Sequence, residues 1–463
     1  MEVNLCEVQD LCVEAPAGCG KTHLIVQSLA NSQIVKPVLV LTHTNAGVDA
    51  LKKKLKSSKV PSKSYVLRTL DGWCSWFVRS FPKLSGFSAT DFESKDHFEK
   101  MREASLGVLE NENLRKLIKT TYSRVIVDEY QDCDYQQDAL IEKFRELLPV
   151  VVLGDPMQSI FGFRKDEVVD FSNVKERYPR TYYLDDPWRW KNSGTRELGE
   201  WIMRARDELA RTGSVANSLK FKPKQVSERI CRRNKGNGAI WDLNKSFKDN
   251  GYNAFFIVKG YDTQLRKKLA KTIGCLTLCE RQGMPDIVRD LLEYDSAENK
   301  TEKLIDLLRS ISVCCLGDAK ARLKTHATTG NFRKSPSELE EKLFNHYDNP
   351  IPERALAVLK EFDSYCFKGG KGKPRIYRRD AMNFISDVFE KSSKLNVSLR
   401  EVLLNVKNTY KTNSGRFIIG SSLLFKGLET DAVVILNWEE MEKEELYVAL
   451  SRASKEIVLL TSQ

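Results

Sequence analysis

The sequence contains no long uninterrupted apolar run. No stretch reaches the roughly 18 apolar residues that a transmembrane helix requires. The first residues also lack the basic segment, apolar segment and cleavage site of a secretory signal. These absences argue against membrane and secreted proteins, and we therefore expect a cytoplasmic protein with no membrane partner.

Paired cysteines, repeats and low-complexity tracts are also missing. The 11 cysteines are scattered and form no CxxC pair, which disfavours a zinc or iron–sulfur centre and favours reduced thiols. No segment recurs at a fixed period, which disfavours a repeat architecture. An apolar fraction of 41% instead predicts a globular protein, and the length suggests about three domains of ~150 residues each.

The chain has an excess of positive charge. Its 74 basic and 63 acidic residues give a formal net charge of +11. Such a charge favours an anionic partner such as nucleic acid. By itself this is weak evidence, because many basic proteins bind no nucleic acid.

The first motif lies between an apolar strand-like run and a helix-like segment. It fits the AxxGxGKT form of the nucleotide-binding P-loop, whose glycines allow backbone N–H groups to surround a polyphosphate. In this motif the lysine reaches the β- and γ-phosphates and the threonine hydroxyl ligates Mg²⁺. The predicted ATP-binding residues are Ala15, Pro16, Ala17, Gly18, Cys19, Gly20, Lys21 and Thr22.

A second motif about a hundred residues later supplies two adjacent carboxylates. The apolar run of residues 125–127 ends in Asp128 and Glu129, which places both at the end of a predicted strand. Asp128 is expected near the metal ion, and Glu129 beside the water that would attack the γ-phosphate. Together the two motifs predict nucleotide hydrolysis with ATP and Mg²⁺ as cofactors.

The order of apolar runs and helical stretches predicts an α/β protein with parallel sheets. We expect a first domain over residues 1–180 with a charged helical insertion at about 85–120. A second domain is expected over 181–275 and 416–463, beginning with a strand near 182–184. Residues 276–415 are rich in helix formers and are expected to form a helical insertion in this second domain.

Five further segments follow the first two motifs in a set order. They are residues 41–46 (LTHTNA), 152–164 (VLGDPMQSIFGFR), 184–189 (LDDPWR), 421–429 (SSLLFKGLE) and 445–453 (ELYVALSRA). With these motifs the sequence resembles superfamily 1 DNA helicases of the UvrD/Rep type over almost its whole length. The resemblance implies two RecA-like parallel-sheet domains with mostly helical inserted subdomains. The forms of the acidic and GDxxQ segments are similar to the branch that moves 3′ to 5′ on DNA.

The resemblance also assigns roles at the nucleotide. With Lys21 and Glu129, the implied catalytic residues are Gln158, Arg189 and Arg452. Gln158 would link the γ-phosphate to the strand-binding surface, although a buried amide satisfied by backbone is the structural alternative. Both arginines would reach the γ-phosphate from the second domain, so hydrolysis would require closure of the cleft. Glu429 would lie near the ribose hydroxyls.

A further set of residues matches positions that contact single-stranded DNA in the family. Aromatic residues among them would stack on bases without regard to sequence, or would alternatively pack beneath the cleft. The predicted DNA-binding residues are Thr42, His43, Asn45, Thr69, Phe161, Phe163 and Arg164.

Two departures from the family pattern leave a second function open. His43 replaces an aromatic residue that stacks more strongly, and Leu423 replaces a histidine that commonly precedes the KGLE segment. The first interpretation is an ATP-driven 3′ to 5′ helicase acting on single-stranded and tailed duplex DNA. The alternative is a nucleotide-switched DNA-sensing subunit that activates or recruits a partner nuclease, for example in anti-phage defence. An RNA-directed motor ranks below both.

Overall fold

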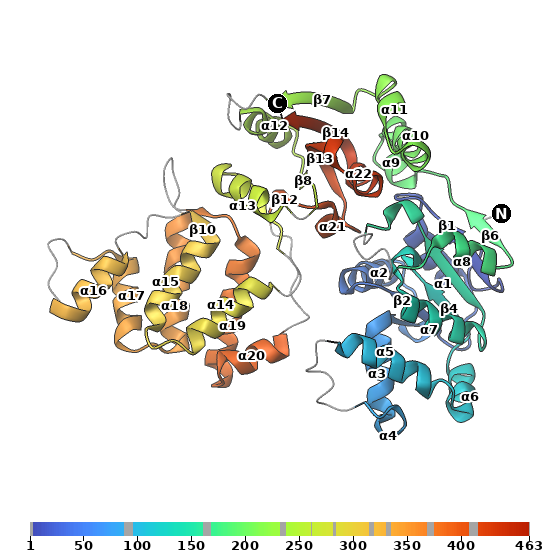
Figure 1. The fold of residues 1–463 in the computed structure, drawn as a ribbon, viewed down its shortest axis with the longest axis horizontal. Helices are drawn as coiled ribbons and strands as arrows, with labels where there is room; N and C mark the ends of the chain where they lie inside the picture. The colour runs from blue at the N-terminus through green and yellow to red at the C-terminus, as the bar shows by residue number, and fades with distance from the viewer. Residues whose placement is uncertain are drawn as a thin grey trace. The chain divides into compact units, whose positions relative to one another are not determined.

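The computed structural model describes residues 3–87, 96–160, 168–231, 238–260, 262–280, 284–313, 319–329, 335–367, 375–406 and 415–462. These residues form two compact units (Figure 1). The first unit comprises residues 1–226, 426–429 and 441–456. The second comprises residues 227–425, 430–440 and 457–463. Short segments near the C-terminus therefore belong to the same unit as the predicted P-loop.

A six-stranded sheet forms the centre of the first unit. Its strand order is β3-β2-β4-β5-β1-β6, and every neighbouring pair is parallel. Strands β2 and β5 are buried along their whole length, as expected where helices cover both faces of a parallel sheet. The strands are β1 (Leu11–Glu14), β2 (Val38–Thr42), β3 (Tyr65–Thr69), β4 (Val125–Val127), β5 (Val150–Gly154) and β6 (Thr181–Tyr183).

Successive residues of these strands point into different cores. Leu39 and Leu41 pack into one cluster, whereas Val38 and Val40 pack into the other, because side chains alternate across a strand. The surrounding helices are α1 (Lys21–Asn31), α2 (Asn45–Ser57), α3 (Leu70–Ser80), α4 (Pro82–Ser85), α5 (His97–Val108), α6 (Glu112–Thr121), α7 (Tyr135–Arg145), α8 (Phe171–Arg177), α9 (Trp188–Asn192), α10 (Arg196–Thr212), α11 (Ala216–Lys220) and α22 (Lys443–Leu450).

The second sheet has the order β7-β14-β13-β8-β12-β9. Strand β8 pairs in parallel with β12 and β13, and β12 pairs in parallel with β9. The strands are β7 (Val226–Cys231), β8 (Ala254–Val258), β9 (Thr277–Leu278), β12 (Phe417–Gly420), β13 (Thr430–Leu436) and β14 (Ala453–Ser462). The accompanying helices are α12 (Gly238–Asp249), α13 (Thr263–Thr272) and α21 (Ser422–Phe425). The predicted α/β fold with two parallel-sheet domains is thereby confirmed.

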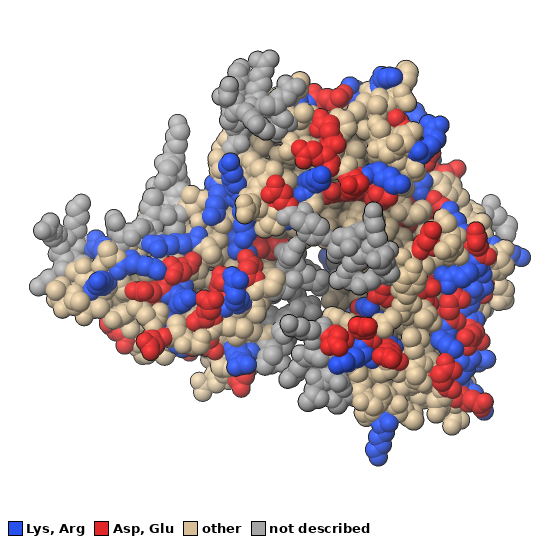
Figure 2. Space-filling model, viewed as in Figure 1, with Lys and Arg blue, Asp and Glu red and all other residues tan. Residues whose placement is uncertain are grey.

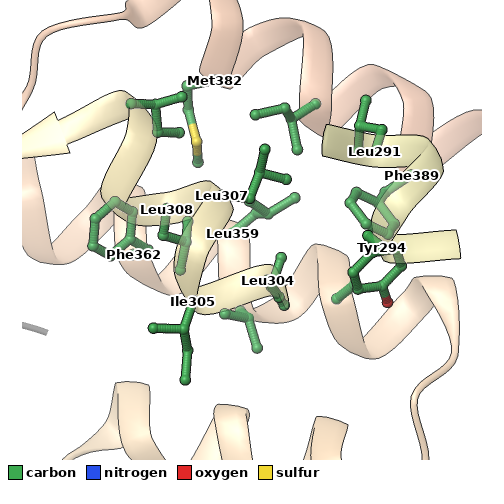
Figure 3. Close-up of a cluster of buried hydrophobic side chains, with 14 of the residues drawn as sticks. Leu291, Tyr294, Leu304, Ile305, Leu307, Leu308, Leu359, Phe362, Met382 and Phe389 are labelled. Atoms are coloured by element: carbon green, nitrogen blue, oxygen red, sulfur yellow. The ribbon is translucent and has the colours of Figure 1, made fainter. Parts of the chain in front are cut away.

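The helices between residues 285 and 406 have a core of their own. Aliphatic and aromatic side chains such as Leu304, Leu359 and Phe389 are fully buried in it (Figure 3). The elements are α14 (Pro285–Asp295), α15 (Lys300–Ile311), α16 (Ala319–Thr329), α17 (Glu338–Asp348), α18 (Pro352–Phe367), α19 (Arg379–Leu395) and α20 (Leu399–Val406), with a short antiparallel pair of β10 (Ser312–Val313) and β11 (Arg375–Ile376). We call helices α14 to α20 the helical group.

Two features differ from the sequence-based expectations. The strand expected to open the second domain is β6, and it pairs in parallel with β1 in the first sheet. The first compact unit also continues beyond residue 180, through α9 and α10, to Val226, and it takes in residues 441–456, so Arg189 and Arg452 lie in this unit and not, as expected, in the second. Both differences arise because strand pairing with β1 and the packing of α10 against α22 and α9 hold this segment on the first unit.

Candidate active site

The P-loop residues connect the carboxyl end of β1 to the first turn of α1. Gly18 and Gly20 adopt positive φ angles of 74° and 94°, which L-residues with side chains rarely adopt. A Cβ atom on Gly18 would also lie 2.6 Å from the ring of Trp190. Lys21 is the first residue of α1 and is buried, with Thr22 beside it. The start of α1 is thus shaped to receive a polyphosphate on backbone N–H groups.

The acidic pair follows β4 immediately. Glu129 has a left-handed backbone, with φ of 57°, an uncommon conformation for a residue with a side chain. Its Oε2 atom lies 3.2 Å from the Nζ atom of Lys21 and accepts a 2.7 Å hydrogen bond from Gln131. The backbone N–H of Asp128 donates to the carbonyl of Leu41 at 2.8 Å. This fixed turn aims Glu129 at the P-loop lysine.

The two carboxylates have opposite electrostatic surroundings. Burial opposes the ionisation of Glu129, but Lys21 and Lys426 outweigh it and lower the pKa of Glu129 to about 2. Burial and the neighbouring charge of Glu129 raise the pKa of Asp128 to about 7. Asp128 is therefore a partly buried carboxylate whose charge is incompletely compensated by positive charge. A divalent cation would relieve this, so the residues present fit the predicted Mg²⁺.

Gln158 and Arg452 are in direct contact. The side-chain N–H of Arg452 donates to Oε1 of Gln158 at 3.2 Å, and the amide of Gln158 donates to Asp155 at 3.0 Å. Arg452 also donates to the carbonyl of Val448 at 2.9 Å. Burial and the charge of Arg189 lower the pKa of Arg452 to about 10. The Gln158 amide is thus held by Asp155, close to it in sequence, and by Arg452, near the C-terminus.

Arg189 and Glu429 form an ion pair that also joins segments remote in sequence. The guanidinium of Arg189 lies 2.6 Å from Oε1 of Glu429 and also donates to the carbonyl of Ser451. Its backbone N–H donates to the carbonyl of Gly18 at 3.1 Å. Helix α9 therefore packs directly on the P-loop, and Arg189 lies between the loop and the segment of Glu429.

A buried network that the motifs did not predict connects the same segments. The hydroxyl of Tyr447 accepts from the backbone N–H of Ala17 at 2.9 Å and donates to Asp155 at 3.0 Å. Arg206 of α10 contacts Asp155 at 2.9 Å and Glu14 at 2.7 Å. Tyr447 and Asp155 lie within motifs that were identified without a role for them. Arg206 has no sequence signal, because its neighbours form an ordinary amphipathic helix.

Lys426 provides another link between the N- and C-terminal segments. Its Nζ atom contacts both carboxylate oxygens of Asp132, one of them at 2.7 Å, and the carbonyl of Gln158 at 2.6 Å. The two side chains are 11% and 5% exposed. Removal of either charge would leave the other buried and unpaired, which is strongly destabilising.

An exposed aromatic ring stands beside the P-loop. Trp188 is 41% exposed, and a Cβ atom on Gly20 would lie 3.3 Å from its indole. The centre of its ring lies 6.1 Å from that of His23. Trp188 belongs to the LDDPWR segment, in which only Arg189 has a predicted role. An accessible indole in this position could stack on the base of a bound nucleotide.

The predicted DNA-binding residues at the ends of β2 and β3 lie close together. Thr42 and Thr69 are register partners in neighbouring parallel strands. Thr42 is only 2% exposed, and the hydroxyl of Thr69 caps α3. His43 lies 3.3 Å from the thiol of Cys133, and burial lowers its pKa. Asn45 is exposed at the start of α2. Phe161, Phe163 and Arg164 lie outside the described residues.

Comparisons with known proteins find a family and several relatives that are similar to parts of the chain. Residues 2–106 and 96–179 match the family described as UvrD/REP helicase N-terminal domain. The chain is 31% identical over 85 residues to RecBCD enzyme subunit RecB of Buchnera aphidicola, and 32% identical over 91 residues to an ATP-dependent helicase/nuclease subunit of Oenococcus oeni. These matches cover 18% and 20% of the chain and 7% of each relative.

A third relative is similar over a longer stretch. Gabija protein GajB of Bacillus cereus is 23% identical over 306 residues, which cover 54% of the chain and 61% of that protein. The resemblance of the sequence to superfamily 1 helicases of the UvrD/Rep type is confirmed by these matches. Among the described residues, no helix has both the length and the apolar character to cross a membrane.

Proposed function

We propose, from the similarity of this chain to the UvrD/Rep-type helicases, that it hydrolyses ATP to move along single-stranded DNA. The observation that carries this proposal is the convergence of Lys21, Glu129, Gln158 and Arg452 in one compact unit. The four side chains come from four separate motifs. A purely structural core would not require these residue types in two contacting pairs, Lys21 with Glu129 and Gln158 with Arg452.

Each residue has a defined part in the proposed reaction. The P-loop N–H groups and Lys21 would bind the phosphates, with Thr22 and Asp128 holding Mg²⁺, which supplies positive charge to the phosphates. Glu129 would orient and deprotonate the attacking water. The charge of Arg189 and Arg452 would stabilise the transition state. Because Lys21 pairs with Glu129, phosphate binding would compete for Lys21 and release Glu129.

Gln158 would couple hydrolysis to the strand. Its side chain contacts Arg452, and its carbonyl accepts from Lys426. The predicted strand-contacting residues Phe161, Phe163 and Arg164 follow it in sequence. Movement of Arg452 during hydrolysis would therefore be transmitted to this segment, as expected of a site in which closure and reopening perform work. We propose 3′ to 5′ movement from the forms of the acidic and GDxxQ motifs.

The direct test is ATP turnover with and without single-stranded DNA. We expect stimulation by the strand, and loss of turnover in Lys21→Ala. A strand-displacement assay with 3′- and 5′-tailed duplexes then tests the direction, and only the 3′-tailed substrate should be unwound. Turnover indifferent to every nucleic acid would refute the motor.

A second candidate is a DNA-sensing ATPase that activates or recruits a partner nuclease, for example in anti-phage defence. It is favoured by relatives named as subunits of a helicase/nuclease and of the RecBCD enzyme, by the similarity to a Gabija protein, and by the altered position His43. Strand-stimulated ATPase without strand displacement, together with a co-purifying nuclease, would select this candidate. Displacement of a 3′-tailed duplex by the chain alone would select the first.

A further inference from the structure

One short segment of the first unit carries a strong excess of positive charge. Residues 45–63 contain six lysines and one acidic residue, Asp49, a net charge of +5 out of +11 for all 463 residues. The segment comprises α2 and the turn that follows it. The lysines are Lys52, Lys53, Lys54, Lys56, Lys59 and Lys63.

Helix α2 holds these lysines on its outer side. Leu51 and Leu55 are 2% and 0% exposed and pack into the core of the first unit. Lys52 and Lys56 are four residues apart and therefore share one face of the helix, with Lys53 next to them. All three are exposed, as is Lys59 in the turn.

None of these lysines is held by an acidic partner among the described residues. The helical group shows the opposite pattern, with blue and red side chains interspersed in Figure 2. There Lys303 pairs with Glu293, and Lys320 pairs with Asp306. An array of like charges without counter-charges repels itself and gains stability when an anion neutralises it.

The position of α2 identifies the class of anion. The helix begins at Asn45, directly after Thr42 and His43, and these three residues are predicted to contact the strand. We propose that Lys52, Lys53, Lys56 and Lys59, here called the α2 lysines, bind the phosphate backbone of DNA beyond these predicted strand contacts. This inference rests on the proposed function, and it extends the predicted DNA contact of the protein along α2.

The dimensions suit such a contact. Helix α2 has 13 residues and is therefore about 20 Å long at 1.5 Å per residue. The α2 lysines occupy its second half and the following turn, a length over which one strand of B-DNA places about three phosphates at about 3.4 Å each. Lysine, a flexible point charge, suits contact with a backbone whose sequence varies. Lys54 is not counted among the α2 lysines, because its charge lowers the pKa of Asp128 and of Glu429 at the proposed nucleotide site.

The test measures DNA affinity as a function of salt in the full chain. In the variant Lys52→Gln/Lys53→Gln/Lys56→Gln/Lys59→Gln, the slope of log affinity against log salt should fall by up to about 3 on a long single strand, or about 4 on duplex. Long oligothymidylate and a duplex with a short 3′ tail are tested separately. The substrate on which the salt slope falls identifies the form of DNA that contacts α2.

Two controls separate charge from folding. The variant Lys245→Gln/Lys248→Gln/Lys268→Gln/Lys324→Gln removes the same charge from exposed positions of α12, α13 and α16 and should keep the wild-type slope. Replacement of all four α2 lysines by arginine should also keep the wild-type slope. An unchanged slope in the α2 glutamine variant, on both substrates, would overturn the inference, and an acidic protein would then be the better occupant.

A short oligonucleotide keeps this test independent of the motor. ATP turnover stimulated by a strand too short to reach the α2 lysines should be equal in wild type and the α2 variant. If wild type shows no stimulation while the salt slopes still differ, the proposed motor fails and the DNA contact stands. If stimulation is normal and the slopes are equal, only the DNA contact fails.

Discussion

At the scale of single residues, Glu129 is distinguished by both its backbone and its electrostatics. It occupies a left-handed conformation and forms an ion pair with Lys21. Uncommon backbone conformations persist where the surrounding structure enforces them, and they are frequent at functional sites. Its low pKa keeps the carboxylate ionised beside the P-loop lysine, as the proposed activation of a water molecule requires.

We therefore predict that Glu129→Gln retains ATP binding but slows hydrolysis by about 100-fold or more, the range for loss of a general base. Nucleotide affinity and single-turnover hydrolysis are the two measurements. Glu142→Gln, a change on α7 at a carboxylate that pairs with Arg145 and Arg177 and not with Lys21, is the control. Preserved turnover in Glu129→Gln would remove this residue from the reaction.

The second prediction at this scale concerns Trp188. If its exposed indole stacks on the nucleotide base, Trp188→Ala should weaken ATP binding by about 1–3 kcal/mol, the range for base–aromatic stacking. Trp188→Phe should recover part of the loss. Trp241→Ala, which removes an indole of similar exposure at 48%, should leave affinity unchanged. Equal affinity in wild type and Trp188→Ala would show that the ring does not contact the base.

At the scale of elements, α22 joins the last motif to the P-loop. Tyr447 bonds to the backbone of Ala17 and to Asp155, and Arg452 follows two residues after the helix ends. We predict that Tyr447→Phe lowers the maximal rate of hydrolysis by about tenfold, because a lost buried hydrogen bond of about 1–2 kcal/mol loosens this alignment. Nucleotide affinity should change little.

The control for this prediction is Tyr365→Phe, which alters an exposed tyrosine of the helical group. Melting temperatures of all variants identify any general loss of stability. A Tyr447→Phe protein with a normal maximal rate would show that the hydroxyl is only a packing contact.

Three helices of the helical group meet at a buried histidine. His346 of α17 contacts the hydroxyl of Tyr294 at 2.8 Å and that of Thr301 at 2.6 Å. Burial, with the charges of Lys300 and Arg354, lowers its pKa from 6.5 to about 4. The unfolded chain therefore binds a proton between these values that the folded protein does not.

Stability of the helical group should consequently fall as pH drops from about 6.5 towards 4, by up to about 3 kcal/mol. Hydrogen exchange of residues 285–406 in the full chain, corrected for intrinsic rates, measures this. His346→Gln should start from lower stability and lose this part of the pH dependence. His326→Gln changes a histidine on α16 and should retain it. The same pH dependence in His346→Gln and wild type would contradict the assignment.

At the scale of the whole molecule, the sequence predicts chemistry more completely than connectivity. The P-loop and acidic pair are visible because few residue types can bind phosphate and metal at fixed spacing. The assignment of β6 to the first sheet was missed, because the three residues Thr181–Tyr183 are partly exposed and carry no sign of which sheet they join. Arg206 was missed because its partners, Glu14 and Asp155, are remote in sequence.

The central claim is that segments from both ends of the chain complete one hydrolytic site. The most direct test is single-turnover ATP hydrolysis by Arg452→Ala with saturating single-stranded DNA, alongside a separate measurement of nucleotide affinity and an Arg196→Ala control. We predict a rate lower by about 10³-fold or more, as for loss of an arginine finger, with affinity within a few-fold of wild type. An unchanged rate, or a defect confined to affinity, would contradict the account.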